Sequence, residues 1–112
     1  MKWLSFNCRG MASASKKLAL CKLFEANSMD IIMLQETLGD ADLITRFLES
    51  LKPGWNFYSL DAMGRSGGLS IGYNPHTIKV ISSWGGLRFI DMDIFSGELG
   101  MDLRIINIYG PY

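Results

Sequence analysis

Residues 30–35, which include Ile31-Ile32-Met33-Leu34, form a nearly unbroken apolar run between two stretches in which apolar residues recur at helical spacing. Such short runs are typical of strands with both faces covered, because a strand with one wet face alternates apolar and polar residues. A chain that places such a strand among helices folds as layers of helices and sheet. The run therefore predicts an α/β fold with this strand in its interior.

The remaining elements follow from the change in apolar spacing along the chain. Residues 2–7 read as a strand, and helical spacing predicts one helix from Ser13 or Ser15 to about residue 27 and another from Gly39-Asp40 to residue 51. Strand-like spacing then predicts strands at 55–60, 68–73, 78–84, 87–95 and 103–109, separated by turn-rich segments. A β-α-β-α start followed by an antiparallel meander predicts half of an α/β sandwich. Because a strong strand ends just before residue 112, we expect residues 1–112 to form a partial, interrupted domain.

Composition limits the classes of function. Eleven basic and eleven acidic residues give zero formal charge, so phosphate binding would depend on local groups or a divalent ion. No apolar stretch approaches the roughly 20 residues of a membrane helix, and the N-terminus does not read as a secretory signal, so no membrane partner is expected. Cys8 and Cys21 are interpreted as small buried hydrophobic residues in a reducing, intracellular compartment.

Polar residues stand where three of the expected strands end: Asn7, Glu36 and Tyr109. If these strands share one core, the three side chains converge on one rim, where ligand sites commonly form. A carboxylate at the end of a buried strand needs a partner, and Mg²⁺ is one. Each residue also has a plainer interpretation: a glutamate that reaches solvent or an arginine, a turn asparagine and an ordinary strand aromatic.

Four motifs follow one another along the chain: F-N-C-R-G, M-L-Q-E-T, G-R-S-G-G-L-S-I-G-Y and I-I-N-I-Y-G-P-Y. In this order and spacing they resemble the endonuclease/exonuclease/phosphatase superfamily. More narrowly, they resemble the apurinic-type endonuclease domain of LINE-type, non-LTR retrotransposons, and the stretch from Gly64 to Leu69 is especially similar to plant elements. The resemblance implies the N-terminal half of a four-layer α/β sandwich. It also implies hydrolysis of phosphodiester bonds in DNA with Mg²⁺, or Mn²⁺, as cofactor, and location in the nucleus if chromosomal DNA is the substrate.

The resemblance also implies residue roles. Glu36 matches the metal-binding glutamate of the Gln-Glu motif, whereas Asn7 and Tyr109 match catalytic residues that contact the phosphate. Two positions depart from the pattern: Arg9 stands where some relatives have Asp, and Tyr112 stands where many have Asn. The later family motifs, Asp-x-Asn and Asp-His, do not occur within the 112 residues, so we expect the isolated fragment to lack turnover.

Other candidate residues are weaker. The single histidine, His76, lies in an Asn-Pro-His turn and is interpreted as a hairpin residue rather than a base. Asp91 and Asp93 share one strand face, which we expect to be solvated rather than a metal site, and Gly64–Gly68 lacks the Lys-Ser/Thr of a P-loop. Two rival interpretations stay open: a catalytically dead remnant or binding module on the same fold, and an unrelated small α/β domain. No motif indicates an oligomeric state.

Overall fold

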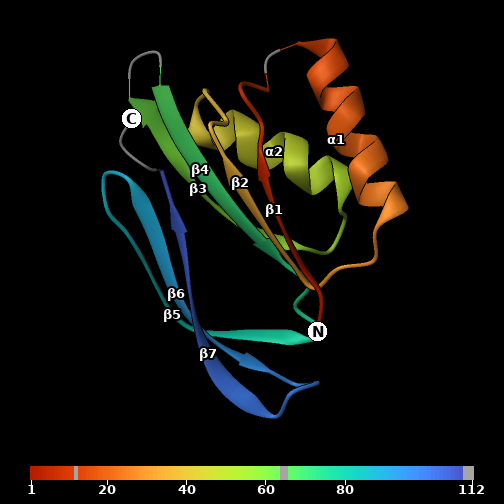
Figure 1. The fold of residues 1–112 in the computed structure, drawn as a ribbon, viewed down its shortest axis with the longest axis vertical. Coiled ribbons are helices and arrows are strands. Elements are labelled where there is room, and N and C mark those ends of the chain that lie inside the picture. The colour runs from red at the N-terminus through yellow and green to blue at the C-terminus, as the bar shows by residue number, and fades with distance from the viewer. Residues whose placement is uncertain (12, 64–65, 110–112) are drawn as a thin grey trace.

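The computed structural model describes residues 1–11, 13–63 and 66–109. Its first sheet, sheet A, has four strands in the order β1-β2-β4-β3 (Figure 1). These strands are β1 (Trp3–Asn7), β2 (Ile31–Gln35), β3 (Asn56–Met63) and β4 (Ser66–Tyr73). β1 and β2 are parallel, whereas β4 runs antiparallel to both β2 and β3. Because a parallel pair needs a crossover connection, the helix between β1 and β2 is part of the same unit.

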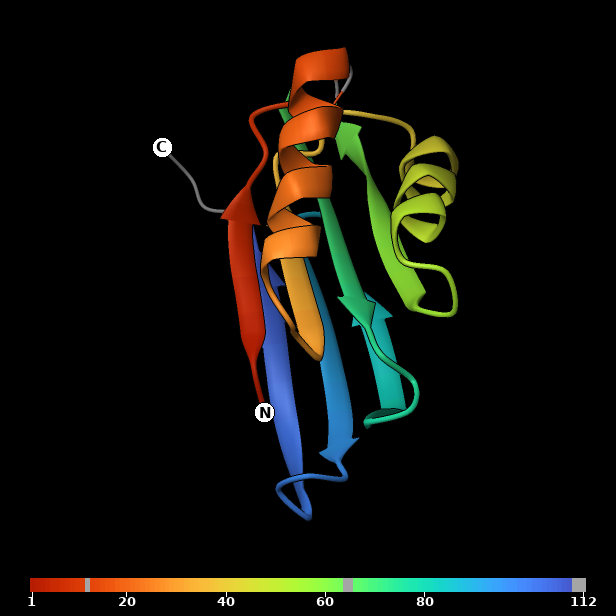
Figure 2. The ribbon, with the colours of Figure 1, turned by 90° about the vertical axis from the view of Figure 1, so that its right-hand side faces the viewer.

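Two helices, α1 (Ala14–Ala26) and α2 (Ala41–Leu51), cover one face of sheet A (Figure 2). Each helix begins at a residue that accepts a hydrogen bond from a main-chain N–H of the first turn. Ser13 caps α1 by accepting from Lys16, and Asp40 caps α2 by accepting from Leu43, both at 3.2 Å. Such caps satisfy N–H groups that have no partner inside the helix.

The helices bury the apolar stripes that the sequence predicted. Leu20 and Phe24 of α1, and Ile44 and Leu48 of α2, face sheet A. The buried residues of this helix–sheet core are Cys8, Met11, Leu20, Phe24, Met29, Ile32, Leu34, Ile44 and Leu48.

A second sheet, sheet B, packs against the other face of sheet A (Figure 1). It is an antiparallel meander of β5 (Ile78–Gly85), β6 (Phe89–Ser96) and β7 (Met101–Ile108). The buried residues between the sheets are Ile31, Leu69, Ile71, Ile78, Ile90, Met92, Ile94, Ile105 and Tyr109. Ile31 therefore faces one core and Ile32 the other, which confirms that both faces of β2 are covered.

The strands after α2 are divided between the two sheets, which the sequence pattern did not predict. The β3–β4 hairpin completes sheet A, and only β5, β6 and β7 form the meander. The physical reason lies in β4, where Leu69, Ser70, Ile71 and Gly72 are all buried. A strand buried on both faces belongs inside a sheet between two layers, and β4 lies between β2 and β3.

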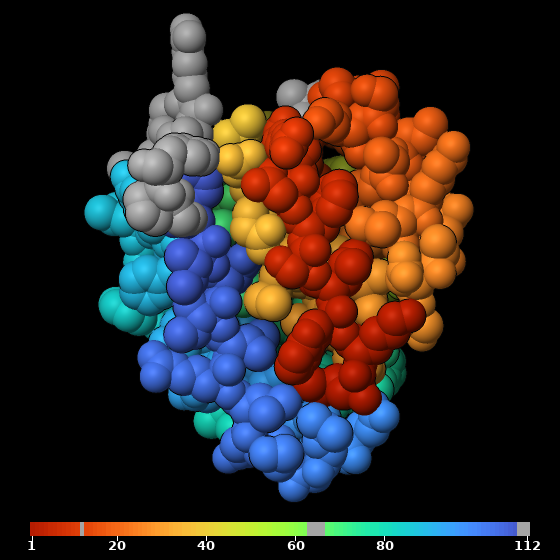
Figure 3. Space-filling model, viewed as in Figure 1, coloured from red at the N-terminus to blue at the C-terminus, as the bar shows by residue number. Residues whose placement is uncertain are grey.

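The described residues form three layers: helices, sheet A and sheet B (Figures 1 and 2). β1 and β7 are the end strands of their sheets, and Figure 3 shows both on one side of the molecule. The outer face of sheet B carries large solvent-exposed apolar residues, including Trp84 at 63% and Ile108 at 59% exposure. No helix of the described residues covers that face. Within residues 1–11, 13–63 and 66–109, neither α1 nor α2 has the length and apolar character that a membrane crossing requires.

Candidate active site at the rim of the two sheets

Asn7 and Glu36 are neighbours because they stand at the ends of parallel strands. Asn7 lies opposite Gln35 in the β1–β2 ladder. Main-chain hydrogen bonds continue beyond the strands, from Cys8 N–H to the Gln35 oxygen and from Gly10 N–H to the Glu36 oxygen, each at 2.8 Å. These bonds hold the two strand ends together and define one rim of the molecule.

The backbone at this rim is strained. Arg9, Glu36 and Leu38 have φ angles of 50°, 52° and 53°, and they are the only described non-glycine residues with positive φ. Such conformations cost about 1–3 kcal/mol each and concentrate at functional sites. All three flank the ends of β1 and β2, so the strain lies where the candidate site residues are.

The glycines of β4 hold the turn that follows Glu36. Thr37 N–H donates to the Gly68 oxygen at 3.2 Å, and Leu38 N–H donates to the Gly67 oxygen at 3.1 Å. A Cβ on Gly68 would overlap the Thr37 hydroxyl and lie 2.9 Å from the Leu38 nitrogen, and Gly68 has φ of +86°. This close approach explains part of the glycine-rich stretch Gly64–Gly68. Residues 64 and 65 of that stretch lie outside the described residues.

Asn7 is exposed, and its side-chain oxygen accepts a hydrogen bond from Arg9 N–H at 3.0 Å. This is the turn role that an asparagine at a strand end commonly has. With the oxygen used in the turn, the NH₂ group is the donor that Asn7 offers to a bound ligand.

Tyr109 follows β7 at the same rim. Its side chain is 9% exposed, and its main-chain N–H donates to the Arg88 oxygen at 2.9 Å. It lines a cavity of about 210 Å³ that lies between the β3–β4 hairpin and the β5–β6 loop. The lining residues are Leu60, Asp61, Gly67, Gly68, Leu69, Leu87, Arg88 and Tyr109. Because Gly67 and Gly68 also bond the turn after Glu36, the cavity adjoins the Asn7–Glu36 side of the rim.

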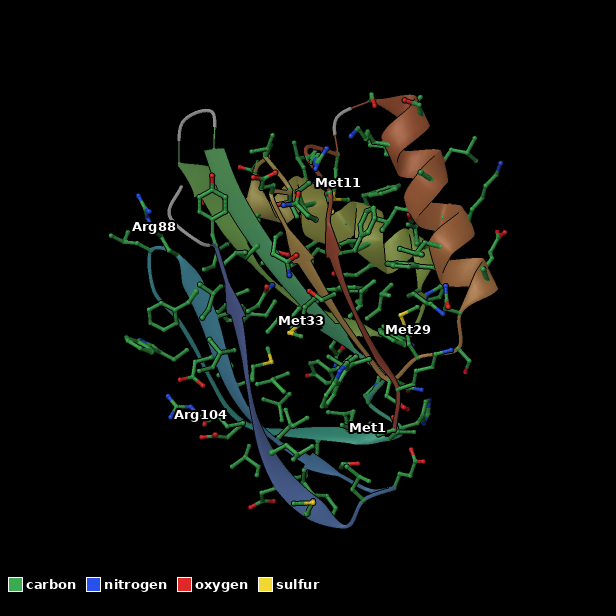
Figure 4. The ribbon with its side chains drawn as sticks, in the orientation of Figure 1. Met1, Met11, Met29, Met33, Arg88 and Arg104 are labelled. Atoms are coloured by element: carbon green, nitrogen blue, oxygen red, sulfur yellow. The ribbon has the colours of Figure 1, made fainter. Side chains whose placement is uncertain are left out.

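Arg88 is a member of this rim that sequence reasoning missed. It lies in the loop between β5 and β6, near the end of β7 (Figure 4). An arginine is a strong donor to phosphate oxygens, because its planar guanidinium presents several N–H groups. Its only sequence signal is its position after the Gly85-Gly86 turn, which by itself does not distinguish it from an ordinary surface arginine.

Gln35 and Asn107 form a second feature that the sequence did not reveal. Gln35 Nε2 donates to the Asn107 oxygen at 2.8 Å, so a side chain of sheet A is bonded to a side chain of sheet B. Asn107 is buried, and it lies two residues before Tyr109.

Cys8 is buried beneath the rim, and burial is the main cause that raises the pKa of its thiol from 9.0 to about 12. The nearby positive charge of Lys16 lowers the pKa and the charge of Glu36 raises it, but both effects are smaller. Cys8 is therefore a protonated, apolar part of the core, as predicted. Cys21 is only partly buried, which corrects the prediction that it is a core residue, and both thiols are free.

The remaining candidates lie away from the rim. His76 is exposed in its turn, where its N–H donates to the side chain of Asn74 at 3.0 Å. Asp91 and Asp93 project from the outer face of sheet B, and Asp91 forms an ion pair with Arg104 at 2.5 Å. This hydrogen-bonded pair holds the pKa of Asp91 below its ordinary value. Tyr112 lies outside the described residues.

The residues at the rim fit a hard divalent cation in a limited way. Mg²⁺ binds through one or two carboxylates and keeps its other positions for water and phosphate oxygens. Glu36 supplies one carboxylate, and its main chain has the positive φ of 52° described above. Among the described residues there is no group of three or more His, Cys, Asp or Glu that could enclose an ion. The rim therefore fits a metal shared with a phosphate better than one enclosed by protein.

No protein-family model and no curated protein sequence matches the chain. Several solved structures do match. The catalytic domain of Xenopus laevis APE2 has a TM-score of 0.72 at 21% identity, with 100% of this chain and 46% of that chain covered. An endonuclease/exonuclease/phosphatase from Bacteroides vulgatus has a TM-score of 0.71 at 16% identity, with coverages of 95% and 51%. D. rerio TDP2, complexed with single-strand DNA product, has a TM-score of 0.69 at 17% identity, with coverages of 92% and 43%.

The chain thus spans about half the length of the solved structures that it matches. Nearly all of its own residues are covered, so the likeness includes both sheets and both helices. The chain has the fold of the endonuclease/exonuclease/phosphatase structures over about half of their length, as its motifs predicted.

Proposed function

We propose that the chain is the N-terminal part of a Mg²⁺-dependent DNA endonuclease from a LINE-type retrotransposon-derived protein. The observation that carries this proposal is the rim itself. Asn7 of β1 lies opposite Gln35, the residue before Glu36, and Gln35 bonds Asn107 of β7. Tyr109, two residues after Asn107, shares a cavity with Arg88. Amide, carboxylate, phenol and guanidinium are the groups that bind a metal–phosphate ligand.

Each side chain has a distinct role in the proposed reaction. Glu36 would hold Mg²⁺ or Mn²⁺, which supplies Lewis-acid polarisation of the phosphodiester when bound. The Asn7 NH₂ group and the Tyr109 hydroxyl donate hydrogen bonds to phosphate oxygens and orient them. Arg88 adds a local positive charge, which matters because the chain has no net charge to attract DNA.

The proposed substrate and setting have separate support. Single-strand DNA product is bound in the matching D. rerio TDP2 structure, which supports DNA as the class of substrate. The retrotransposon origin, close to plant elements, rests on the motif resemblance, and a nuclear location would follow from action on chromosomal DNA. The family motifs Asp-x-Asn and Asp-His do not occur within the 112 residues, so residues 1–112 should bind metal and phosphate without turnover.

Manganese binding tests the proposal, because Mn²⁺ replaces Mg²⁺ at oxygen ligands and is visible by electron paramagnetic resonance. We expect one Mn²⁺ site per chain. Glu36→Gln should weaken it by more than about tenfold, since even residues behind a ligand are worth ~10–100-fold. Glu49→Gln on the exposed face of α2 removes the same charge and should bind as the wild type does. Equal binding by both variants would refute the role of Glu36.

The rival function is a nucleic-acid-binding module that does not hydrolyse its ligand. Its support is that the described residues contain no group of three or more metal-ligating side chains. The two functions differ in their need for metal. A binding module should hold a DNA oligonucleotide equally well with Mg²⁺ and with a chelator, whereas the proposed site should bind it more tightly with Mg²⁺.

A further inference from the structure

Asn107 links four strands through one buried amide. Its Nδ2 donates to the main-chain oxygens of Leu34 at 3.0 Å and Ser70 at 2.9 Å, which face each other across β2 and β4. Its Oδ1 accepts from Gln35 Nε2 at 2.8 Å, and Gln35 Nε2 also donates to Ser5 Oγ of β1 at 3.0 Å. The amide of β7 is thus tied to β2 and β4 directly and to β1 through Gln35.

This amide is unusual in its surroundings. Asn107 is 1% exposed, and the rest of the inter-sheet core consists almost entirely of Ile, Leu and Met side chains. Burying an amide costs free energy unless its hydrogen bonds are made, and here both donor and acceptor atoms are used. A leucine of similar volume would pack against the same neighbours without that requirement. What the amide adds over a leucine is the directionality of its hydrogen bonds, which favours one alignment of the two sheets.

The link lies next to the candidate site residues. Gln35 directly precedes Glu36, and Asn107 precedes Tyr109 by two residues. Residues two apart in a strand share a face, so Asn107 and Tyr109 both point toward sheet A. An apolar interface alone tolerates small sliding of one sheet over the other, and such sliding would move Tyr109 relative to Glu36.

We propose that Asn107 is a positioning residue that fixes the Tyr109 side chain relative to Glu36 by locking the alignment of sheet B on sheet A. This inference rests on the proposed function for the purpose of the link, but the alignment itself needs no bound metal. A misplacement of about 1 Å can lower a reaction rate by ~100-fold, so such a lock has a clear catalytic use.

Asn107→Leu is the direct test, because it keeps the volume and removes all three hydrogen bonds. The matched control is Ser96→Ala, which removes another buried polar group of sheet B, one that accepts a hydrogen bond from Leu99 N–H of the adjoining turn at 3.1 Å. Thermal unfolding by circular dichroism first establishes that each variant folds. The Tyr109 ring is then followed by NMR, through its chemical shifts and its nuclear Overhauser effects to Leu69.

We expect Asn107→Leu to shift the Tyr109 ring signals and weaken the effects to Leu69, and Ser96→Ala to leave both unchanged. Asn107→Leu should bind Mn²⁺ with the affinity of the wild type, because Glu36 is intact. The broadening that bound Mn²⁺ causes in the Tyr109 ring signals should be smaller in Asn107→Leu than in the wild type. A folded Asn107→Leu with wild-type Tyr109 signals would overturn the inference.

Two further outcomes remain informative. If Asn107→Leu does not fold, Gln35→Met removes only the Gln35 bonds and should shift the Tyr109 ring in the same way by a smaller amount; no shift would overturn the inference. If the wild type binds no Mn²⁺, the proposed metal site fails, while the metal-free Tyr109 signals still decide the role of Asn107.

Discussion

At the scale of single residues, Cys8 shows how strongly the rim is joined to the core beneath it. Its main-chain N–H bonds the Gln35 oxygen, and its side chain is buried among apolar residues of the helix–sheet core. The thiol must therefore stay protonated in the folded chain. Its pKa of about 12 connects the ionisation of one side chain to the stability of the whole domain.

We predict that Cys8 makes the chain less stable in alkali. In the unfolded chain the thiol ionises near its ordinary pKa of 9.0, whereas in the folded chain it ionises only near 12. The contribution of the protonated thiol to the free energy of unfolding is therefore complete below pH 9. It is lost as the pH rises toward 12, by about 1.4 kcal/mol per pH unit. Urea unfolding from pH 8 to 11 should show this slope in the wild type and a flatter one in Cys8→Ala. Parallel slopes would show that Cys8 does not cause the loss.

A second prediction concerns the contact between β4 and the turn after Glu36. Gly54 and Gly68 have φ of +87° and +86°, but a Cβ meets nothing within 4 Å at Gly54 and meets Thr37 and Leu38 at Gly68. Gly54→Ala should cost about 1 kcal/mol of backbone strain, and Gly68→Ala should cost ~1–3 kcal/mol more for the overlap. Urea unfolding of both variants measures the difference. Equal losses would mean that β4 does not support the Glu36 turn.

Asn7, Glu36 and Tyr109 could be proposed from the sequence because each stands at the end of a run of strand residues. Arg88 and Asn107 were not identified, for a physical reason. Arg88 lines the cavity beside Tyr109 because the β5–β6 loop lies next to the end of β7. Asn107 is a candidate because it donates hydrogen bonds to strands of the other sheet. Both contacts join segments far apart in the chain, and local spacing carries no information about them.

At the scale of elements, β2 and the two helices follow most directly from the sequence. The unbroken apolar run of β2 requires cover on both faces, and the stripes of α1 and α2 supply it on one of them. The division of the later strands was not predictable in the same way. Strand-like spacing marks each strand, but whether β4 pairs beside β2 depends on contacts across the sheet rather than on its neighbours in sequence.

The outer face of sheet B leads to a prediction at this scale. Exposed apolar groups that cluster on a sheet bind dyes and promote association. We expect 8-anilinonaphthalene-1-sulfonate to fluoresce with the wild type, and less with Ile106→Thr/Ile108→Thr on β7. Leu43→Thr on α2 is the control, because Leu43 is a single exposed leucine at 64% exposure. Equal fluorescence from all three proteins would mean that sheet B does not present a binding face.

At the scale of the whole molecule, the two sheets share both a core and a rim. β1 and β7 are the end strands of their sheets and lie on one side of the molecule (Figure 3). The matching solved structures are about twice as long as this chain.

Under the proposed function this rim binds phosphate together with a divalent cation, and a map of amide chemical shifts locates that binding residue by residue. The ¹⁵N-labelled chain is titrated with a short single-stranded DNA oligonucleotide, with Mg²⁺ and then with a chelator. We expect the largest shifts at Asn7, Glu36, Arg88 and Tyr109, and only when Mg²⁺ and oligonucleotide are both present. Shifts confined to the helical face, or shifts at the rim that are the same without Mg²⁺, would contradict the claim.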